Sequence, residues 1–475
     1  MKRLTACLLF SLMGLTAMSQ EKWDLKRAID YALQNNISVK QQDIQARFAA
    51  LTYNQSKLSQ YPSLNFGSNL GLNTGRNIDR TTNQFTTETT LYNSFNLQTN
   101  VDVFNFFSKK NAIAANKLDM EATMATVDKV KNDIALNVAG TYLQILLNRE
   151  QIEISRVQMQ QTAAQLSNTR KLVQAGSVPE LNAVQLEAQL AQDSSNVVSA
   201  KGAEAQSLLL LKALLSLDAG TPFDITTPAV ETIPIDPISE LQPELVYQAA
   251  LQNLPQQRVN DLRIKAAQKN AEAAKGAMYP SFSLGASLQT NYSNFKNQAR
   301  QTGAAPFTDT IGKVFGSNDP VVRTVFVPTY QFYSDRYGSQ FLNNFGNGIG
   351  LNISVPIFNG GTARTAWRRA KLNIQTYEFQ QQQDNLTLKQ DIYKAYTDAI
   401  TSLEKFNAAS KTVLATERAF DFAGKRYGIG LLSTIELTTT QTNLFSARLQ
   451  RSLAQYDFVF KMKVLEFYKG QGLRL

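Results

Sequence analysis

The feature that most constrains the fold is an internal duplication that keeps its register over most of the chain. Ala32-Leu33-Gln34-Asn35 recurs as Ala250-Leu251-Gln252-Asn253, and Tyr61-Pro62-Ser63 recurs as Tyr279-Pro280-Ser281, both at an offset of 218 residues. Farther along, the offset becomes 254 and stays there, in pairs such as Phe104/Phe358, Lys117/Lys371, Tyr142/Tyr396 and Gly176/Gly430. A fixed spacing over so many matches indicates two copies of one structural unit, which must fold alike.

The two copies are joined by a proline-rich stretch. We expect a first repeat at 20–217, a connector at 218–245, a second repeat at 246–468 and a C-terminal tail at 469–475. Proline lacks a backbone donor and clashes inside a helix, so a dense run of prolines predicts an extended connector. Five of the 13 prolines lie in or near this stretch, at Pro222, Pro228, Pro234, Pro237 and Pro243.

Each repeat contains two windows in which apolar and polar residues alternate, which is the period of a β-strand. Leu64, Phe66 and Leu70, for example, share one face of the first window. Apart from Asp102, the four windows carry no charge. Their length suits the roughly 9–11 residues that a tilted outer-membrane strand needs, although a half-buried sheet in a soluble protein would give the same alternation. The predicted strands cover 63–73, 94–105, 281–292 and 346–358.

Four strands are too few to close a barrel, since the smallest useful closure takes about eight. A membrane role therefore requires that the chain pool its strands with copies of itself. The connections between the paired windows, 74–93 and 293–345, are polar or aromatic, and we expect both to be exposed loops, the second very long.

Two stretches could each form a helix on the order of 100 Å long. Both 108–175 and 362–427 contain no proline and a single glycine. Apolar residues recur in them at heptad spacing, which predicts packing against neighbouring helices. Gly176 and Gly430 follow, at the position where glycine often ends a helix. Further helices are expected at 178–217 and 432–465, and shorter helical stretches at 24–60 and 241–278.

The composition excludes several kinds of chemistry. Histidine is absent and Cys7 is the only cysteine, which rules out His/Cys zinc sites and histidine-dependent nucleophiles. We recognise no paired carboxylates, phosphate-binding glycine loop or metal-ligand spacing, so we predict no catalytic residues, no metal site and no cofactor. The formal charge is +10, but the basic residues are scattered through helical stretches, which argues against nucleic-acid binding.

The N-terminus has the pattern of a secretory signal peptide. A short basic start is followed by an apolar run, and Ala17-Met18-Ser19 fits a cleavage site. We therefore expect residues 1–19 to be removed on export. Leu4-Thr5-Ala6-Cys7 has the form of a lipoprotein box, but too few residues precede Cys7 for such a signal, so lipidation is not expected. Beyond this segment no apolar window is long enough to predict a membrane helix.

The order of these elements, duplicated, resembles the TolC family of outer-membrane efflux proteins over nearly all of residues 22–468. The resemblance implies a mixed α/β membrane protein and a homotrimer. Each protomer would give four strands to one twelve-stranded β-barrel in the lipid of the bacterial outer membrane, continued by an α-helical barrel across the periplasm. It is carried by Leu25-Lys26-Arg27-Ala28-Ile29, Ala32-Leu33-Gln34-Asn35-Asn36, Tyr61-Pro62-Ser63-Leu64, Val355-Pro356-Ile357-Phe358-Asn359-Gly360-Gly361 and Tyr427-Gly428-Ile429-Gly430.

The resemblance also implies partners. A periplasmic adaptor protein and an inner-membrane efflux transporter would dock at the helix tips, at Gly176 and Gly430, and substrate would pass through the shared lumen. The transporter would supply the energy, so this chain is expected to catalyse nothing.

Members of the family narrow the periplasmic entrance with acidic residues after the second tip glycine. Here the two positions are Glu436 and Thr439. Tyr427 matches an aromatic residue that helps to hold the entrance closed, and Leu432 stands where a gating arginine is common. Leu432 and Thr439 therefore depart from the family pattern, and these two departures favour a more apolar closure. Three Glu436 carboxylates in a ring would favour cations, although a glutamate in the first turn of a helix is also explained by the helix dipole alone.

The leading hypothesis is therefore a passive outer-membrane exit duct for small toxic compounds. A duct for secreted polypeptides would use the same fold with a different transporter. A periplasmic structural or adhesive protein, whose sheet is only half buried, is the alternative from a different class.

Overall fold

The computed structural model describes residues 22–78, 85–228, 233–294, 296 and 298–470. The expected signal peptide, with Cys7, and all but the first two residues of the expected tail lie outside the described residues. The described residues of 1–52, 116–267 and 372–475 form one compact unit, which is mainly helical, and those of 53–115 and 268–371 form a second, which holds the β-strands. Each unit draws on both sequence repeats, so the compact units cut across the boundary between the repeats.

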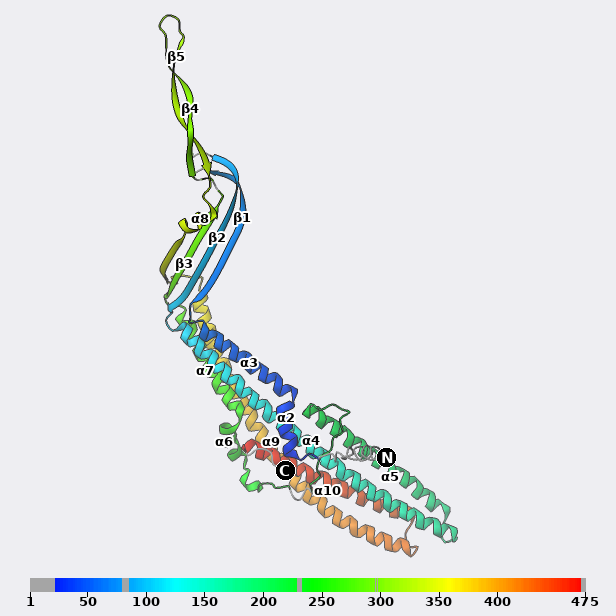
Figure 1. Ribbon diagram of the computed structural model, residues 1–475. Helices are drawn as coiled ribbons and strands as arrows, with labels where there is room; N and C mark the ends of the chain where they lie inside the picture. The colour runs from blue at the N-terminus through cyan, green and yellow to red at the C-terminus, as the bar shows by residue number, and fades with distance from the viewer. Residues whose placement is uncertain (1–21, 79–84, 229–232, 295, 297, 471–475) are drawn as a thin grey trace, which may run out of the picture. The chain divides into compact units, whose positions relative to one another are not determined.

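The second unit contains a four-stranded antiparallel sheet with the order β1-β2-β3-β6 (Figure 1). Its strands are β1 (Ser63–Ile78), β2 (Phe85–Phe104), β3 (Ser281–Ser293) and β6 (Gly346–Ser354). The first hairpin is longer than expected, because β1 and β2 extend into the predicted loop. β6 is shorter than the predicted 346–358, since Pro356 cannot donate to a β-ladder. In the part of the chain that the structure describes, no strand pairs with the outer edge of β1 or β6.

The strand register merges the apolar windows into one continuous face. Phe66 lies opposite Leu97, and Leu97 lies opposite Leu288. Side chains that are directly opposite on neighbouring strands share a face of the sheet, so an apolar row crosses three strands here. Val103, which we expected in this alternation, falls at a bulge, and Phe104 takes the position opposite Phe282 instead.

The other face of the same sheet is polar and hollowed. A cavity of about 540 Å³ lies over it. Asn65 of β1, Gln98 of β2 and Ser287 of β3 are directly opposite one another in the register and all line this cavity. The sheet thus presents an apolar side and a polar side on which Asp102 adds a charge to the uncharged residues of the windows, as the alternation predicts.

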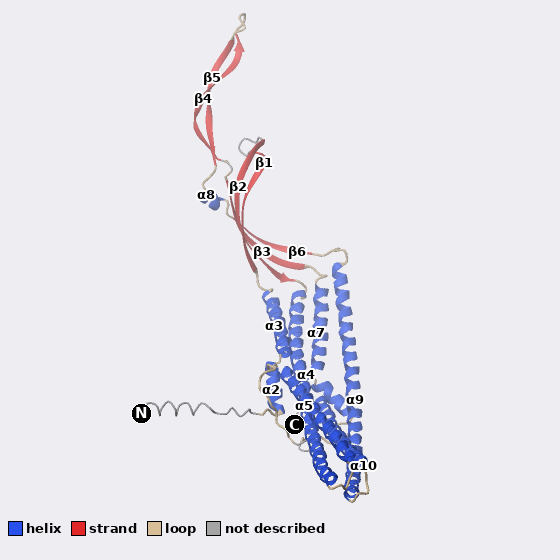
Figure 2. Cartoon of the chain, turned by 90° about the vertical axis from the view of Figure 1, so that its right-hand side faces the viewer, coloured by secondary structure: helices blue, strands red, loops and turns tan. Residues whose placement is uncertain are grey.

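The expected loop 293–345 is wrong in its main part, because it contains a second sheet. β4 (Gln298–Lys313) and β5 (Pro320–Tyr333) form a two-stranded antiparallel hairpin, and the short helix α8 (Tyr337–Asn343) follows (Figure 2). β5 is rich in valine and aromatic residues and β4 contains three threonines, and these residue types favour extended structure. α8 packs on the apolar face, where the Thr290 hydroxyl donates to the carbonyl of Phe341 at 2.7 Å.

The long helices are α4 (Ser108–Gln174), α5 (Glu180–Leu215), α9 (Thr362–Gly428) and α10 (Thr434–Lys469). α10 continues four residues past the expected end and into the predicted tail, where Gly470 caps it in the left-handed conformation. Among the described residues, none of the helices combines the length and apolar character needed to cross a membrane.

The two shorter helical stretches are each broken in two. The first divides into α2 (Leu25–Asn35) and α3 (Ile37–Leu58), and the second into α6 (Pro243–Asn253) and α7 (Pro255–Gly276). Asn36 breaks the first, since its backbone is extended and its side-chain oxygen accepts from the N–H of Ser38 at 2.8 Å, which caps α3. Pro255 breaks the second, because a proline disfavours helical geometry at the residue before it.

The duplication is visible in the helical core. One cluster packs α2, α4 and α5 against the connector and α10, and a second packs α6, α9 and α10. Corresponding repeat positions are buried in both clusters, so the two halves use one packing scheme. The corresponding pairs are Ala28/Val246, Ala32/Ala250, Val138/Ile392, Ile145/Ala399 and Leu211/Leu465.

Candidate functional site: the helix tips

Both predicted tip glycines end a long helix in the left-handed conformation. Gly176 follows α4 with φ of 70°, and Gly430 follows α9 with φ of 76°. In each turn two backbone bonds close the helix end: Gly176 N to Val173 O and Ser177 N to Leu172 O in the first, with the equivalent pair in the second. This is the Schellman arrangement, which glycine adopts without the steric cost that a side chain would bring.

Tyr427 ties three helices together near the second turn. It lies in the last turn of α9 and is half-buried. Its hydroxyl lies 3.0 Å from the hydroxyl of Thr169 in α4 and 3.4 Å from that of Thr434, the first residue of α10. Thr434 itself is buried. The phenol therefore joins the α9–α10 turn to α4 within one chain.

A second polar chain lies deeper and was not predicted. Gln441 of α10 donates to the Thr162 hydroxyl of α4 at 3.1 Å, and Thr162 donates to the carboxylate of Asp193 in α5 at 2.6 Å. All three side chains are buried. Because a buried polar group costs free energy unless it is hydrogen-bonded, these residues specify how the two helical hairpins align.

Glu436 is held by a capping box at the start of α10. The Ser433 N–H and hydroxyl donate to one carboxylate oxygen of Glu436, at 3.0 and 2.9 Å, and the Glu436 N–H donates to the Ser433 hydroxyl at 3.2 Å. The backbone hydrogen bond from Ser433, followed by the hydroxyl bond, lowers the pKa of Glu436. The carboxylate is therefore charged at neutral pH, exposed, and fixed at the helix tip.

The structure brings some of the predicted residues together but not all. Leu432 and Tyr427 flank the same turn as Glu436, and Leu432 is half-buried. Thr439 is exposed one turn further along α10, where its hydroxyl donates to the carbonyl of Ile435 at 2.7 Å. Gly176 belongs to the separate α4–α5 turn.

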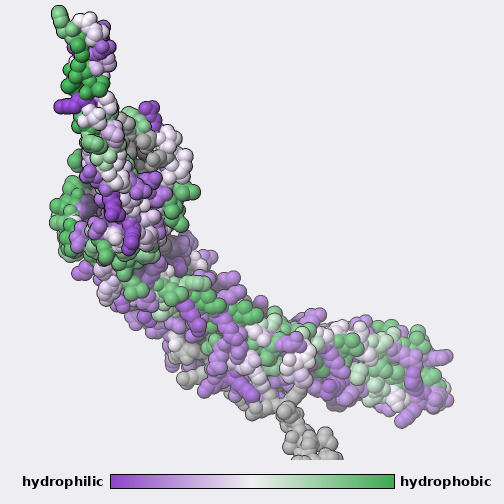
Figure 3. All heavy atoms as spheres, turned by 45° about the horizontal axis from the view of Figure 1, so that its top comes forward, coloured by the Kyte–Doolittle hydropathy of each residue, from purple (hydrophilic) through white to green (hydrophobic). Residues whose placement is uncertain are grey.

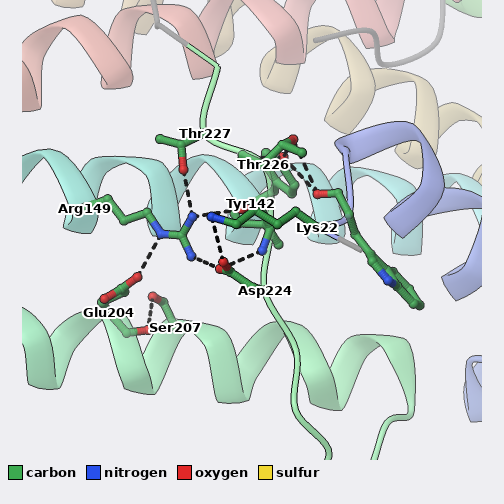
Figure 4. Close-up of polar contacts among 10 residues, drawn as sticks. Lys22, Tyr142, Arg149, Glu204, Ser207, Asp224, Thr226 and Thr227 are labelled. Atoms are coloured by element: carbon green, nitrogen blue, oxygen red, sulfur yellow. Dashed lines mark hydrogen bonds and ion pairs between the residues drawn. The ribbon is translucent and has the colours of Figure 1, made fainter. Parts of the chain in front are cut away.

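A charged cluster around Arg149 of α4 fixes the connector (Figure 4). The Arg149 guanidinium donates to Glu204 of α5 at 2.8 Å, to Asp224, and to the carbonyl of Ile225 at 2.9 Å. Thr227 accepts a further bond at 2.7 Å. One side chain thus binds two helices and the connector. The heptad spacing could have revealed the importance of Arg149, because Arg149 lies along the same helix seam as Tyr142, Ile145 and Ile152.

Electrostatics reinforce this cluster. Burial opposes the charge on Arg149, but the hydrogen bonds to Glu204 and Asp224 outweigh it, so the pKa of Arg149 is raised. Burial likewise opposes ionisation of Asp224, but hydrogen bonds from Arg149, Lys22 and the Ile225 N–H outweigh it and lower the pKa of Asp224.

The lowered pKa of Asp224 predicts acid sensitivity. The unfolded chain takes up a proton near pH 3.8, before the folded chain does, so the stability contributed by Asp224 is complete above about pH 4 and is lost as pH falls through the lower folded pKa. Below about pH 4, we expect the denaturant concentration at the unfolding midpoint to decrease as pH falls in the parent, and to decrease less steeply in Asp224→Asn. Equal slopes in pH-dependent denaturation would contradict this role.

Comparison with known proteins identifies the class. The model of a family described as "Outer membrane efflux protein" matches residues 28–216 and 246–465. The chain belongs to the outer membrane efflux protein family, whose members are channels of the outer membrane that extend into the periplasm.

The relatives are distant but cover most of the chain. The chain is 23% identical to the "Probable outer membrane lipoprotein SilC" of Salmonella typhimurium, over 94% of this chain and 85% of SilC. It is 20% identical to the alkaline protease secretion protein AprF of Pseudomonas aeruginosa, over 71% of this chain and 61% of AprF. The crystal structure of the CmeC outer membrane channel of Campylobacter jejuni covers 95% of this chain and 86% of CmeC, at 17% identity and a TM-score of 0.73.

Proposed function

We propose that this efflux channel is the passive exit duct of a tripartite system, carrying small toxic compounds from an inner-membrane transporter to the cell exterior. The observation that supports it best is the sheet: its register unites the apolar residues on one face and uncharged polar residues on the other. In an outer-membrane barrel the apolar side faces lipid and the polar side faces the lumen.

The proposal requires three copies of the chain. The outer edges of β1 and β6 have no partner in the described chain, and an unpaired strand edge is not tolerated in the hydrocarbon layer. Pairing β6 of one copy with β1 of the next leaves no edge when the ring closes. Three copies supply twelve strands, above the roughly eight that closure needs.

The helical unit would form the periplasmic part of the duct. In this proposal the turns at Gly176 and Gly430 are the entrance, where an adaptor protein and the transporter dock. Three Glu436 carboxylates would ring that entrance, and Tyr427, Leu432 and Thr439 would line it. The capping box supports the ring, because it holds each carboxylate charged in a fixed position.

A duct for secreted polypeptides is the second candidate, and the similarity to AprF favours it. The two differ in cargo rather than in fold. Export of a fluorescent drug and of a secreted protein, compared in a deletion strain, separates them, because only the true cargo will accumulate inside the mutant cells.

Conductance tests the channel and the Glu436 ring together. Purified protein in a planar bilayer should give discrete, cation-preferring pores. Glu436→Gln should weaken the preference because it removes the charge, whereas glutamine can still complete a capping box, so the helix tip stays intact. Reversal potentials in a salt gradient measure the effect. Unchanged selectivity would exclude the ring, and no conductance from folded protein would exclude the duct.

A further inference from the structure

The β4–β5 hairpin has two chemically different faces. Alternate residues of a strand share a face, together with their cross-strand partners. Arg300, Asp309 and Arg323, the charged residues within the paired strands apart from Lys313 at the end of β4, all fall on one face by this register. The other face carries Lys313, opposite Pro320 at the end of the ladder, and no other charge. Beyond that pair this face, here called the uncharged face, consists of Val322, Thr324, Phe326, Pro328, Tyr330 and Phe332, opposite Thr310, Thr308, Pro306, Ala304, Gln301 and Ala299.

The uncharged face is open to solvent in the single chain. Phe326 is 68% exposed, Val322 53% and Tyr330 52%, and Figure 3 shows hydrophobic residues along this hairpin. Within the described chain neither strand packs along any helix or strand except its partner. A two-stranded hairpin alone is at best marginally stable in water, so this hairpin needs a cover from another molecule.

The edges of the hairpin are poorly suited to pairing with a strand of another molecule. Pro306 lies within β4 and Pro328 within β5. A proline in a strand is tolerated where its nitrogen faces a free edge, and it makes that edge a poor template for a further strand. The neighbouring molecule must therefore meet the hairpin through a face rather than by extending its ladder.

The position of the hairpin in the chain indicates which molecule this is. The hairpin lies between β3 and the edge strand β6, and its base is held to β3 by α8, where Gln340 donates to the Ser293 carbonyl at 2.8 Å. β6 is the edge that joins the next copy in the proposed trimer. Three identical hairpins would therefore stand at the subunit boundaries of one barrel, at fixed number and high local concentration.

We propose that the uncharged faces of three β4–β5 hairpins, one from each copy, pack against one another around the three-fold axis outside the barrel. This inference rests on the proposed trimer. A cyclic assembly with one face turned to the axis brings each residue near its own copies, so Phe326 meets Phe326 and the charged faces remain in water. Strands of this length form a stalk of about 50 Å, which cargo must pass or part.

Single cysteines test the contact directly. Cys7 is the only cysteine of the chain and lies in the expected signal peptide. The exported parent protein would therefore carry no thiol and serves as the cysteine-free background. In purified full-length protein in lipid nanodiscs, treated with a short bis-maleimide, Phe326→Cys should shift up to two of every three chains to a two-chain species, because each chain has a single thiol. Arg323→Cys, on the opposite face of the same strand, should not. Tyr330→Cys provides a second probe of the uncharged face should the first variant fail to fold.

The outcomes are distinguishable. Cross-linking at Phe326 and Tyr330 but not at Arg323 supports the packed faces. A trimer by light scattering with no cross-link at Phe326, or with equal cross-linking at Arg323, overturns the inference and leaves the duct intact. A bimane at position 326 that is quenched by nitroxide lipid, without cross-linking, shows that the face covers itself with lipid and also overturns it. Absence of any trimer defeats the proposed function together with the inference.

Discussion

Leu288→Arg should prevent the protein from assembling in the outer membrane. Leu288 lies on the apolar face of β3, opposite Leu97 of β2, and is 42% exposed. If that face meets lipid, an arginine there costs about 2–4 kcal/mol per chain near the bilayer midplane, and a closed trimer incurs the cost in every copy. We expect heat-stable trimer in outer-membrane fractions to fall to a small remainder, and refolding into liposomes to fail similarly.

The matched control is Ser287→Arg, one residue earlier on the same strand. Ser287 lines the polar hollow, so its arginine would point into water and assembly should continue. Because it adds positive charge to the lumen, it should also reduce the cation preference of the pore. Failure of Ser287→Arg with tolerance of Leu288→Arg would mean that the two faces are assigned the wrong way round. Equal tolerance of both would mean that the apolar face does not meet lipid.

The faces of the sheet could be predicted because the alternation is local and complete. Each strand window sorts its own residues by period two, and the uncharged polar positions distinguish it from an ordinary half-exposed sheet. What the alternation could not give was the register between strands. The bulge at Val103 shows this, because it depends on how β2 meets β3 and has no mark in β2 alone.

The helix tips were predictable for a similar reason. Glycine after a long proline-free stretch marks a left-handed helix end, and both Gly176 and Gly430 occupy one. The break at Asn36 was missed because asparagine is tolerated inside a helix, and only its bonds to the next helix show that it caps. The hairpin within 293–345 was missed because its alternation is interrupted by two prolines and two bulges.

Polar contacts between distant parts of the chain were the hardest features to predict from the sequence. The chain from Gln441 through Thr162 to Asp193 joins residues from three helices, and no short-range pattern connects them. The sequence did contain one indication of the cluster around Arg149. Arg149 takes a seam position between Ile145 and Ile152, where an unpaired charge would be costly, so a partner from elsewhere in the chain was required. The sequence could not say that the partners would be Glu204 and Asp224.

Arg149→Ala should therefore be among the most destabilising substitutions in the helical unit. The Arg149 side chain is only 17% exposed, and its partners Glu204 and Asp224 are 23% and 28% exposed. Removing Arg149 leaves the partly buried Glu204 carboxylate without its ion pair and Asp224 with only Lys22 and the Ile225 N–H, at a cost of about 3 kcal/mol. Chemical denaturation in detergent, followed by circular dichroism, measures this. Limited proteolysis should also cut the connector 218–245 faster, because Arg149 no longer holds it to α4.

Arg156→Ala provides the control, seven residues further along the same helix. Arg156 pairs with Glu153 at 3.1 Å, but the two side chains are 46% and 59% exposed, and an exposed pair of this kind contributes at most about 0.5 kcal/mol. Arg149→Lys should recover only part of the loss, since a lysine keeps the charge but cannot form the planar fork that reaches both carboxylates. Were Arg149→Ala no worse than Arg156→Ala, or the connector no more open to protease, the connector would be held by its apolar contacts, such as buried Ile225 and Ile233, and the charged cluster would be dispensable.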